Sequence, residues 1–172
     1  MLYCVLITKL IIIRGNSGSG KSSVAKAIQE QVTTYPMLIE HDYIRRKVLK
    51  EKESPESINS ELIYRMIVYG FENGRDVILE VILRLDRYSS LFERLIKIHP
   101  ENNYFYYFDI PFKETLVRHN TKDNADFGED EMRRWYKEGE ETGHENEVIF
   151  TQDSSFDETA NQIIEQTGLI KG

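Results

Sequence analysis

The chain has 172 residues, enough for one ordinary domain to close a hydrophobic core without disulfides or metal ions. It carries 22 basic and 29 acidic residues, a net charge of −7, which argues against a sequence-independent grip on nucleic acid but leaves room for a local basic cleft. The single Cys4 excludes an internal disulfide, and no Cys/His cluster has metal-ligand spacing, so we expect a reducing, cytoplasmic environment.

The first residues are apolar from Leu2 to Ile7. They lack a basic start and a small-residue cleavage site, and Lys9 interrupts them well short of the roughly 20 apolar residues that a membrane span needs. We therefore expect neither a signal peptide nor an anchor. Residues 1–8 exceed what the first strand needs, so they form either an extra edge strand or an N-terminal extension.

Residues 9–27, KLIIIRGNSGSGKSSVAKA, predict a buried strand, a glycine-rich turn and a helix. Gly15, Gly20, Lys21 and Ser22 match the pattern G-x-x-x-x-G-K-[ST] of a phosphate-binding loop. The apolar run before the motif and the helical spacing of apolar residues after it supply the strand and the helix that such a loop requires. The sequence therefore predicts a nucleoside triphosphate site.

Each residue type in this loop suits a bound triphosphate. Glycines let the chain curl tightly and aim successive backbone N–H groups at a phosphate. The helix start adds free N–H donors and the positive end of its dipole. Lys21 can neutralise the β- and γ-phosphates, and the Ser22 hydroxyl can ligate Mg²⁺. The predicted nucleotide-binding residues are Gly15, Asn16, Ser17, Gly18, Ser19, Gly20, Lys21, Ser22 and Ser23.

A short second strand is predicted at residues 37–40, and His41 and Asp42 follow it directly. In open α/β sheets, ligands bind at the carboxyl ends of the strands. Asp42 is therefore a candidate for chemistry. The alternative is that Asp42 only caps the helix predicted from residue 42 to about residue 52.

The strongest strand pattern lies at residues 77–83, whose nearly continuous apolar character indicates a central parallel strand. Apolar residues at helical spacing from Ile58 to Ile67 predict a core-facing helix before it. Glu80 interrupts the strand, and a carboxylate is costly to bury there unless it is paired or liganded. We therefore expect Glu80 at the crevice near the metal, within reach of the substrate.

The rest of the chain continues to alternate strands and helices, which predicts a parallel sheet with helices on both faces. A polar stretch at about 119–131 is expected to form a mobile lid over the nucleotide. The other predicted elements are helices at 88–98, 112–119 and 130–137, strands at 103–110 and 148–151, and a closing helix from residue 156.

Together these residues resemble the small P-loop kinases: GNSGSGKSS at 15–23, Glu40-His41-Asp42 with Arg45 three residues on, and Arg118-His119 before a polar flap. The resemblance is closest to the branch with zeta-toxin-like kinases, chloramphenicol phosphotransferase and the polynucleotide 5′-kinase domain. It implies one α/β domain over residues 1–172, a three-layer sandwich of a five-stranded parallel sheet between helices, with a small lid.

The resemblance also implies roles for individual residues. Asp42 would accept the proton of the substrate hydroxyl, and Arg45 in D-x-x-R resembles the polynucleotide-kinase arginine that holds a substrate phosphate. Glu40 stands where relatives commonly have Asp, at a position that helps to order the Mg²⁺ water shell. Arg118 follows the fourth strand by one helix, as lid arginines do, and would meet the transferred phosphoryl group. The alternatives to it are Lys122, Arg133 and Arg134.

We therefore predict phosphoryl transfer from Mg²⁺–ATP to a hydroxyl of a small molecule or nucleoside. Lys21, Ser22 with its metal and Arg118 would neutralise charge, while Asp42 would orient the hydroxyl. Arg45, Glu80 and Arg87 are the predicted acceptor-binding residues.

Several alternatives remain open at this point. A polynucleotide 5′-hydroxyl kinase fits D-x-x-R but would need a basic groove, and a nucleoside monophosphate acceptor would need a base-recognition segment. A nucleotide-dependent switch would hydrolyse ATP without any acceptor. We expect no membrane partner, and the sequence does not indicate an oligomeric state.

Overall fold

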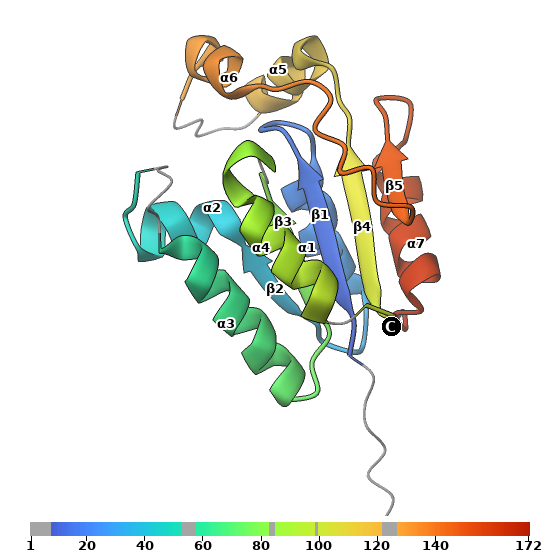
Figure 1. The fold of residues 1–172 in the computed structure, drawn as a ribbon. Helices are drawn as coiled ribbons and strands as arrows, with labels where there is room; N and C mark the ends of the chain where they lie inside the picture. Colours follow the sequence, from blue (N-terminus) through green and yellow to red (C-terminus); the bar gives the residue numbers. More distant parts are fainter. Residues whose placement is uncertain (1–7, 53–57, 83–84, 99, 122–126) are drawn as a thin grey trace, which may run out of the picture.

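The computed structural model describes residues 8–52, 58–82, 85–98, 100–121 and 127–172. Five parallel strands form one sheet in the order β2-β3-β1-β4-β5 (Figure 1). The predicted extension at residues 1–8 falls outside the described residues except for Thr8. The strands are β1 (Leu10–Gly15), β2 (Met37–Glu40), β3 (Val77–Val81), β4 (Asn103–Phe108) and β5 (Glu147–Phe150).

Helices cover both faces of the sheet, so the predicted three-layer arrangement is confirmed. On one face α1 and α7 pack against the strands, and on the other α3 and α4 do so. The helices are α1 (Lys21–Gln31), α2 (His41–Tyr43), the π-helix η1 (Ile44–Val48), α3 (Asn59–Glu72), α4 (Leu85–Ile98), α5 (Phe112–Asn120), α6 (Glu129–Trp135) and α7 (Phe156–Thr167).

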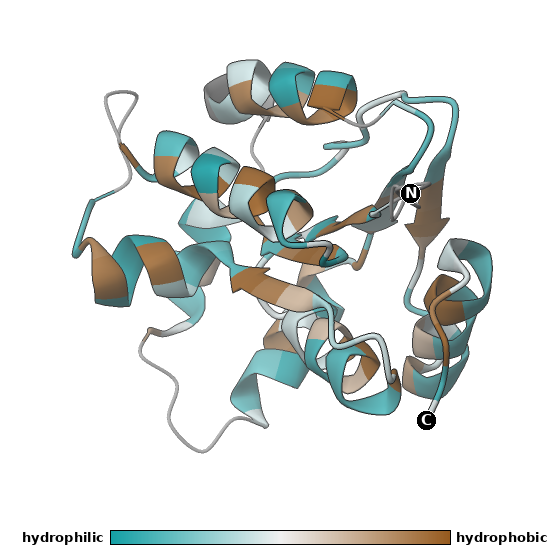
Figure 2. Cartoon of the chain, turned by 90° about the horizontal axis from the view of Figure 1, so that it is seen from below, coloured by the Kyte–Doolittle hydropathy of each residue, from teal (hydrophilic) through white to brown (hydrophobic). Residues whose placement is uncertain are grey.

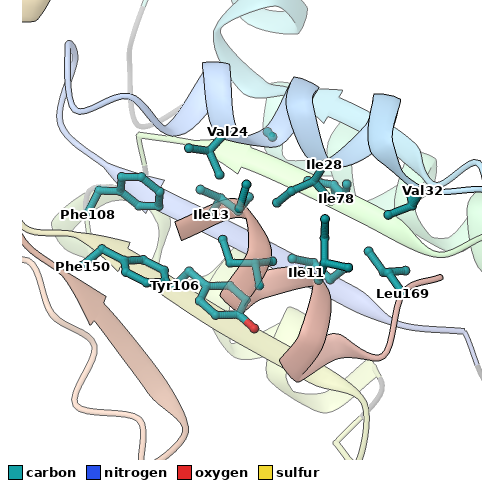
Figure 3. Close-up of a cluster of buried hydrophobic side chains, with 14 of the residues drawn as sticks. Ile11, Ile13, Val24, Ile28, Val32, Ile78, Tyr106, Phe108, Phe150 and Leu169 are labelled. Atoms are coloured by element: carbon teal, nitrogen blue, oxygen red, sulfur yellow. The ribbon is translucent and has the colours of Figure 1, made fainter. Parts of the chain in front are cut away.

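The alternation of side chains along β1 divides the core into two clusters. Leu10 and Ile12 point to the α3 and α4 face, whereas Ile11 and Ile13 point to the α1 and α7 face (Figure 3). All four side chains are fully buried, and each contributes about 1.5–3 kcal/mol of hydrophobic stabilisation. Figure 2 shows the apolar strands in the middle of the molecule, with helices of mixed polarity around them.

The segment after β2 differs from its prediction. We expected one helix from residue 42 to about 52, but α2 lasts one turn and continues as η1, in which Leu49 N donates to Ile44 O. Lys50 then turns the chain with a positive φ of 53°. Asp42 lies inside the first turn and caps nothing, so the capping alternative is wrong.

The helix α3 begins one residue later than its apolar pattern suggested. Ile58, predicted to face the core, is 63% exposed, whereas Ile63 and Ile67 are fully buried as expected. Asn59 is buried instead, because its side chain reaches His41 beneath the carboxyl end of β2.

The helices α5 and α6 lie beyond the carboxyl ends of the strands (Figure 1). They include the two ends of the predicted lid at 119–131, namely residues 119–120 and 129–131, and residues 122–126 lie outside the described part. No helix in the described ranges combines the length and the apolar character that crossing a bilayer would require. Residues at the carboxyl ends of the strands, together with Arg118 of α5, line the pocket that is described below.

Candidate active site

The loop between β1 and α1 has the shape that its glycines predict. Gly18 has a φ of 79°, and a Cβ there would lie 2.4 Å from the carbonyl oxygen of Thr115 on α5. Gly20 has a φ of 97° and forms the N-cap of α1 in the left-handed region. Only glycine suits both positions, because a side chain would be strained at either one. The loop therefore curls tightly enough to present its backbone N–H groups to a phosphate.

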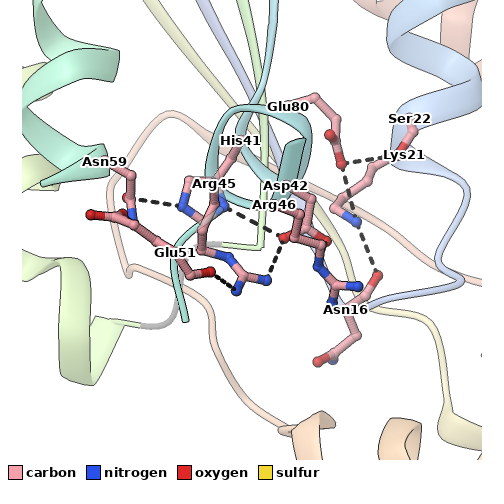
Figure 4. Close-up of polar contacts among 10 residues, drawn as sticks. All are labelled: Asn16, Lys21, Ser22, His41, Asp42, Arg45, Arg46, Glu51, Asn59 and Glu80. Carbon is pink, nitrogen blue, oxygen red and sulfur yellow. Dashed lines mark hydrogen bonds and ion pairs between the residues drawn. The ribbon is translucent and has the colours of Figure 1, made fainter. Parts of the chain in front are cut away.

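Glu80 lies directly beneath this loop and explains the carboxylate in a buried strand. Its Oε1 accepts a hydrogen bond from Ser22 Oγ at 3.0 Å and lies 3.1 Å from Lys21 Nζ (Figure 4). Glu80 pairs in register with Ile13 of β1, so it shares the face on which α1 packs. The buried carboxylate and the buried ammonium thus compensate each other.

The oxygen atoms around Ser22 suit a magnesium ion chemically. A hydroxyl and a carboxylate meet at Ser22 and Glu80, and Glu40 is the register neighbour of Glu80 on β2. Glu40 itself pairs with Lys26 Nζ at 2.9 Å. Within the described ranges no three His, Cys, Asp or Glu side chains cluster around a metal position. Magnesium commonly needs only one or two carboxylates plus substrate phosphates, so this donor set fits.

Asp42 faces the same pocket as the loop. Arg45 Nη2 donates to its Oδ1 at 3.0 Å, and Arg46 Nε lies 3.9 Å from its Oδ2. Burial opposes ionisation of Asp42, but the field of Lys21, Arg46 and Arg45 outweighs it and lowers the pKa of the carboxyl below its usual value. Asp42 is therefore ionised at neutral pH and can accept a hydrogen bond from a hydroxyl.

The arginines near Asp42 are arranged differently from what the sequence suggested. Arg45 was predicted to bind the acceptor, but it donates to Asp42 and to the Glu51 carbonyl oxygen and does not line the pocket. Arg46 and Lys47 line it instead. The sequence contained one indication of the role of Arg46: it follows Asp42 by four residues, and this spacing places two side chains on the same side of a helix. The side chain of Arg87 lies outside the described part of the chain.

A buried polar chain connects the Asp42 turn to α3. His41 Nε2 lies 3.2 Å from Asn59 Oδ1, and Asn59 Nδ2 donates to Glu51 Oε2 at 3.2 Å (Figure 4). Because the amide nitrogen of Asn59 is used on Glu51, its oxygen must accept from His41. The polar chain fixes the turn that carries Asp42.

Arg118 of α5 reaches the loop. Its Nη1 donates to the Ser19 carbonyl oxygen at 3.0 Å, and its Nε donates to Glu114 at 2.8 Å. It lines the pocket beside the loop. Of the three alternatives, Arg133 and Arg134 are exposed, pair with glutamates of their own helix and do not line the pocket, and Lys122 lies outside the described residues.

Asn16 connects the loop to the segment that follows α6. Its Nδ2 donates to the Lys137 carbonyl oxygen at 2.7 Å, and the Lys137 N–H donates back to its Oδ1 at 3.1 Å. Gly15 and Asn16, both predicted to bind nucleotide, do not line the pocket, whereas residues 17–23 all do. The side chain of Asn16 therefore holds the returning chain and leaves phosphate contacts to the rest of the loop.

One pocket of about 700 Å³ is lined by residues 17–23 of the loop together with Asp42, Glu80 and Arg118. The strand order places β2 and β5 at opposite edges of the sheet, with β1 and its loop between them. Asp42 follows β2, and the segment from Thr151 to Phe156 follows β5, so the pocket extends to both sides of the loop. The part of the pocket that follows β5 was not predicted from the sequence, although ligands of open α/β sheets bind at the carboxyl ends of the strands and this rule applies to β5 as well.

This parallel sheet carries a phosphate-binding loop after its central strand β1 and an ionised carboxylate after β2, two strands away, and its fold is that of the P-loop kinases. A sequence model of the family described as chloramphenicol phosphotransferase-like protein matches residues 8–97, more than half of the chain. The chain therefore belongs to the chloramphenicol phosphotransferase-like family. No curated protein matches it.

Solved structures share the fold at low sequence identity. A sugar kinase from Janibacter sp. is 13% identical, with 94% of this chain and 95% of that chain covered and a TM-score of 0.69. A tunicamycin resistance protein from Deinococcus radiodurans is 17% identical, with 96% and 99% covered and a TM-score of 0.67. An APS kinase from Mycobacterium tuberculosis, solved with AMPPNP and APS, is 18% identical, with 92% and 96% covered and a TM-score of 0.67.

Proposed function

We propose that this P-loop kinase transfers the γ-phosphoryl group of Mg²⁺–ATP to a hydroxyl of a small molecule or nucleoside, and that Asp42 orients that hydroxyl. The observation that carries the proposal is the ionised Asp42 carboxylate in the same pocket as the phosphate-binding loop. Phosphoryl transfer needs alignment and charge neutralisation more than covalent help from the protein. A carboxylate facing a triphosphate site supplies the alignment.

In this reaction the acceptor oxygen forms a bond to the γ-phosphorus while the bond from phosphorus to the bridging oxygen of ADP breaks. Asp42 accepts the hydrogen bond of the acceptor hydroxyl and takes its proton as the new bond forms. The lowered pKa of Asp42 makes it a weak base. A weak base suits a loose transition state, in which the hydroxyl keeps its proton until late.

The cationic residues stabilise the charge that is transferred. Lys21 and the loop N–H groups hold the β- and γ-phosphates, and Arg118 supports the loop from α5 through the Ser19 carbonyl. Ser22 and Glu80, with Glu40 beside them, would hold Mg²⁺, which supplies charge neutralisation when bound. Glu80, predicted as a substrate residue, is thereby reassigned to the metal, because its carboxylate already contacts Ser22.

The comparisons support a small-molecule acceptor. Two structural neighbours are a sugar kinase and a gluconokinase, and a third was solved with APS as well as AMPPNP. The polynucleotide alternative has less support, because Arg45 of D-x-x-R points to Asp42 and Glu51 and does not line the pocket. A switch without an acceptor would leave the pocket space around Asp42 unused.

The test is the substitution Asp42→Asn. We expect it to lower kcat by about 100- to 10,000-fold, because the acceptor hydroxyl loses its orienting base, while AMPPNP still binds. Lys21→Ala should weaken both transfer and nucleotide binding. Acceptors would first be identified by thermal shift with AMPPNP–Mg²⁺ against sugars, hydroxy acids, nucleosides and antibiotics, since a true acceptor stabilises the folded protein by mass action.

The control for this test is Glu30→Gln, which neutralises an exposed carboxylate on α1. It should leave both turnover and AMPPNP affinity unchanged. An Asp42→Asn protein that phosphorylates its acceptor as fast as the parent would show that the assignment of Asp42 is wrong.

A further inference from the structure

Arg46 lies at the acceptor side of the pocket, four residues after Asp42. Its side chain is 31% exposed, and its Nε lies 3.9 Å from Asp42 Oδ2, too far for a hydrogen bond (Figure 4). The proposed reaction assigns this arginine no role. Its position beside the carboxylate that would orient the hydroxyl makes it a candidate to contact the rest of the acceptor.

Arg46 differs from the other arginines in its hydrogen bonding. Among the arginines whose side chains the structure describes, it alone donates no hydrogen bond to another described residue, and its Nε is buried without a partner. The others donate to a carboxylate or a backbone carbonyl: Arg14, Arg45, Arg65, Arg75, Arg94, Arg118, Arg133 and Arg134. Because Nε is buried, the donors that this side chain can offer a ligand are its two Nη groups, from which no described residue accepts a hydrogen bond.

Two aromatic rings hold the guanidinium in place, one just before α6 and one at its end. Its central carbon lies 5.4 Å from the ring centroid of Phe127 and 5.4 Å from that of Trp135. Phe127 also stacks on His119 at 4.6 Å and meets Trp135 edge-on at 4.9 Å. Aromatic faces attract the cation but leave the N–H donors along its edge available. Arg46 is therefore oriented before any ligand arrives, which lowers the entropic cost of binding one.

A second cation accompanies Arg46 in the pocket. Lys47, the next residue, also lines it and is exposed, and it has no ion pair with any described carboxylate. By contrast, the exposed Arg65, Arg133 and Arg134 each pair with a glutamate of their own helix. A neutral acceptor would offer neither cation a charged partner, whereas a carboxylate or phosphate would accept charge-assisted bonds from the arginine fork.

We propose that the hydroxyl acceptor carries an anionic group, a carboxylate or a phosphate ester, and that Arg46 binds this group with Lys47 beside it. Arg46 is then the residue that selects the acceptor, while Asp42 orients the hydroxyl to be phosphorylated. This inference rests on the proposed function, because it assigns the substrate class of the same site. The sequence pattern had assigned acceptor binding to Arg45, and this proposal assigns it to Arg46 instead.

The test compares matched acceptors that differ only or mainly in the anion. Suitable pairs are gluconate with glucitol, glucose 6-phosphate with glucose, and adenosine 3′-phosphate with adenosine. For each compound, kcat and KM are measured with the parent protein, Arg46→Met, Arg46→Lys and Lys47→Met. Methionine keeps much of the apolar stem of arginine but removes its charge and donors.

We expect the parent to prefer the anionic member of at least one pair by about 100-fold in kcat/KM. Arg46→Met should remove most of this preference by raising the KM for the anionic compound. The kcat/KM of the neutral compound should change by less than about threefold. Arg46→Lys should restore part of it, because it keeps the charge but loses the fork. The carboxylate and phosphate pairs show which anion the site takes.

The matched control is Arg65→Met, which removes an exposed arginine of α3 outside the pocket. It should leave kcat and KM unchanged for every acceptor. Binding of AMPPNP, measured by calorimetry, verifies that each variant is folded. If Arg46→Met does not fold, Arg46→Lys and Lys47→Met still test the preference.

Two outcomes would overturn the proposal. One is an equal loss of kcat for anionic and neutral acceptors in Arg46→Met, which would mean that Arg46 acts on the transferred group or on Asp42. The other is the absence of any Arg46-dependent turnover or thermal stabilisation with every anion tested in the presence of AMPPNP–Mg²⁺. Full turnover in Asp42→Asn would instead contradict the proposed function, whatever Arg46 does.

Discussion

His41 shows how a single buried residue can make the stability of the Asp42 turn depend on pH. Its ring is 2% exposed and packs edge-on against Tyr88, with ring centroids 5.3 Å apart. Burial lowers the pKa of the imidazole, although Asp42 and Asn59 oppose this effect. The folded protein therefore keeps His41 neutral at pH values at which a free histidine begins to take up a proton.

We expect the protein to become less stable in mild acid. The pKa of His41 is lower in the folded chain than its value of about 6.5 in the unfolded chain. As the pH falls below about 6.5, the unfolded chain binds the proton first, so the free energy of unfolding decreases until the pH reaches the lowered folded pKa. One proton accounts for at most about 1.4 kcal/mol per pH unit.

Urea unfolding at pH 7.5 and pH 5.5 measures this effect. The parent should lose more stability between the two pH values than His41→Gln, whose amide side chain does not titrate. An identical loss in the two proteins would contradict the prediction.

At the scale of an element, Gly70 in the last turn of α3 sets how closely this helix approaches the sheet. A Cβ at this position would lie 2.7 Å from Val77 Cγ2 and 3.4 Å from Met37 Sδ. Glycine normally costs a helix about 1 kcal/mol relative to alanine, but here its missing side chain allows close packing on β2 and β3. A substitution of Gly70 by alanine would therefore improve the helix propensity but worsen the packing of the helix on the sheet.

We predict that Gly70→Ala destabilises the protein by about 1–2 kcal/mol, because overpacking against a buried valine outweighs the gain in helix propensity. Gly128→Ala is the comparison, since its Cβ would meet only the flexible end of Glu131 at 3.6 Å. Thermal or urea unfolding of both variants gives the answer. A more stable Gly70→Ala protein would mean that the helix can shift outward at little cost.

Elements with strong patterns were predictable, and those fixed by distant contacts were not. The sequence placed β2 and α5 to within about one residue and predicted the strand, loop and helix that β1 and α1 form, because apolar periodicity and the glycine loop are local signals. It missed the π-turn after Asp42, since nothing in IRRKV distinguishes that turn from an ordinary helix. Ile58 is exposed because it precedes the first residue of α3, and the periodicity of apolar residues does not specify at which residue a helix begins.

The same limit applies to the site. The motif indicated which residues form the loop, and residues 17–23 do line the pocket. The bonds between Asn16 and Lys137 join residues 121 positions apart, and no sequence pattern predicts such a pair. The side chains of Arg45 and Arg46 both neighbour Asp42 on a helix, so only the structure shows which one lines the pocket.

Across the whole molecule, a buried ion pair ties the centre of the sheet to its edge. Arg14 on β1 donates to Glu147 on β5 at 2.7 Å, past the intervening β4, and also to the Glu140 carbonyl oxygen at 2.6 Å. The second carboxylate oxygen of Glu147 accepts from the Thr142 N–H at 2.7 Å. Burial lowers the pKa of the Arg14 guanidinium, and the Glu147 carboxylate opposes this change. The pair therefore anchors the chain that returns from α6.

We predict that Glu147→Gln destabilises the protein by about 3 kcal/mol, because it leaves a buried guanidinium without a carboxylate. The double variant Arg14→Met with Glu147→Met should be less destabilised than Glu147→Gln, since two apolar side chains carry no buried charge. Chemical denaturation of the two proteins provides the comparison. A double variant that is the less stable of the two would show that the pair contributes more than its desolvation costs.

The pocket that runs from the segment after β5, past the loop, to Asp42 also has a consequence for inhibitor design. A single compound that links an adenine nucleotide to an acceptor mimic through a chain of phosphates would occupy both halves at once. Such a bisubstrate compound loses its translational freedom only once, so its affinity would exceed that of either half alone. Many proteins share the phosphate-binding loop, so the selectivity of the compound would come from the half that contacts Arg46 and Lys47.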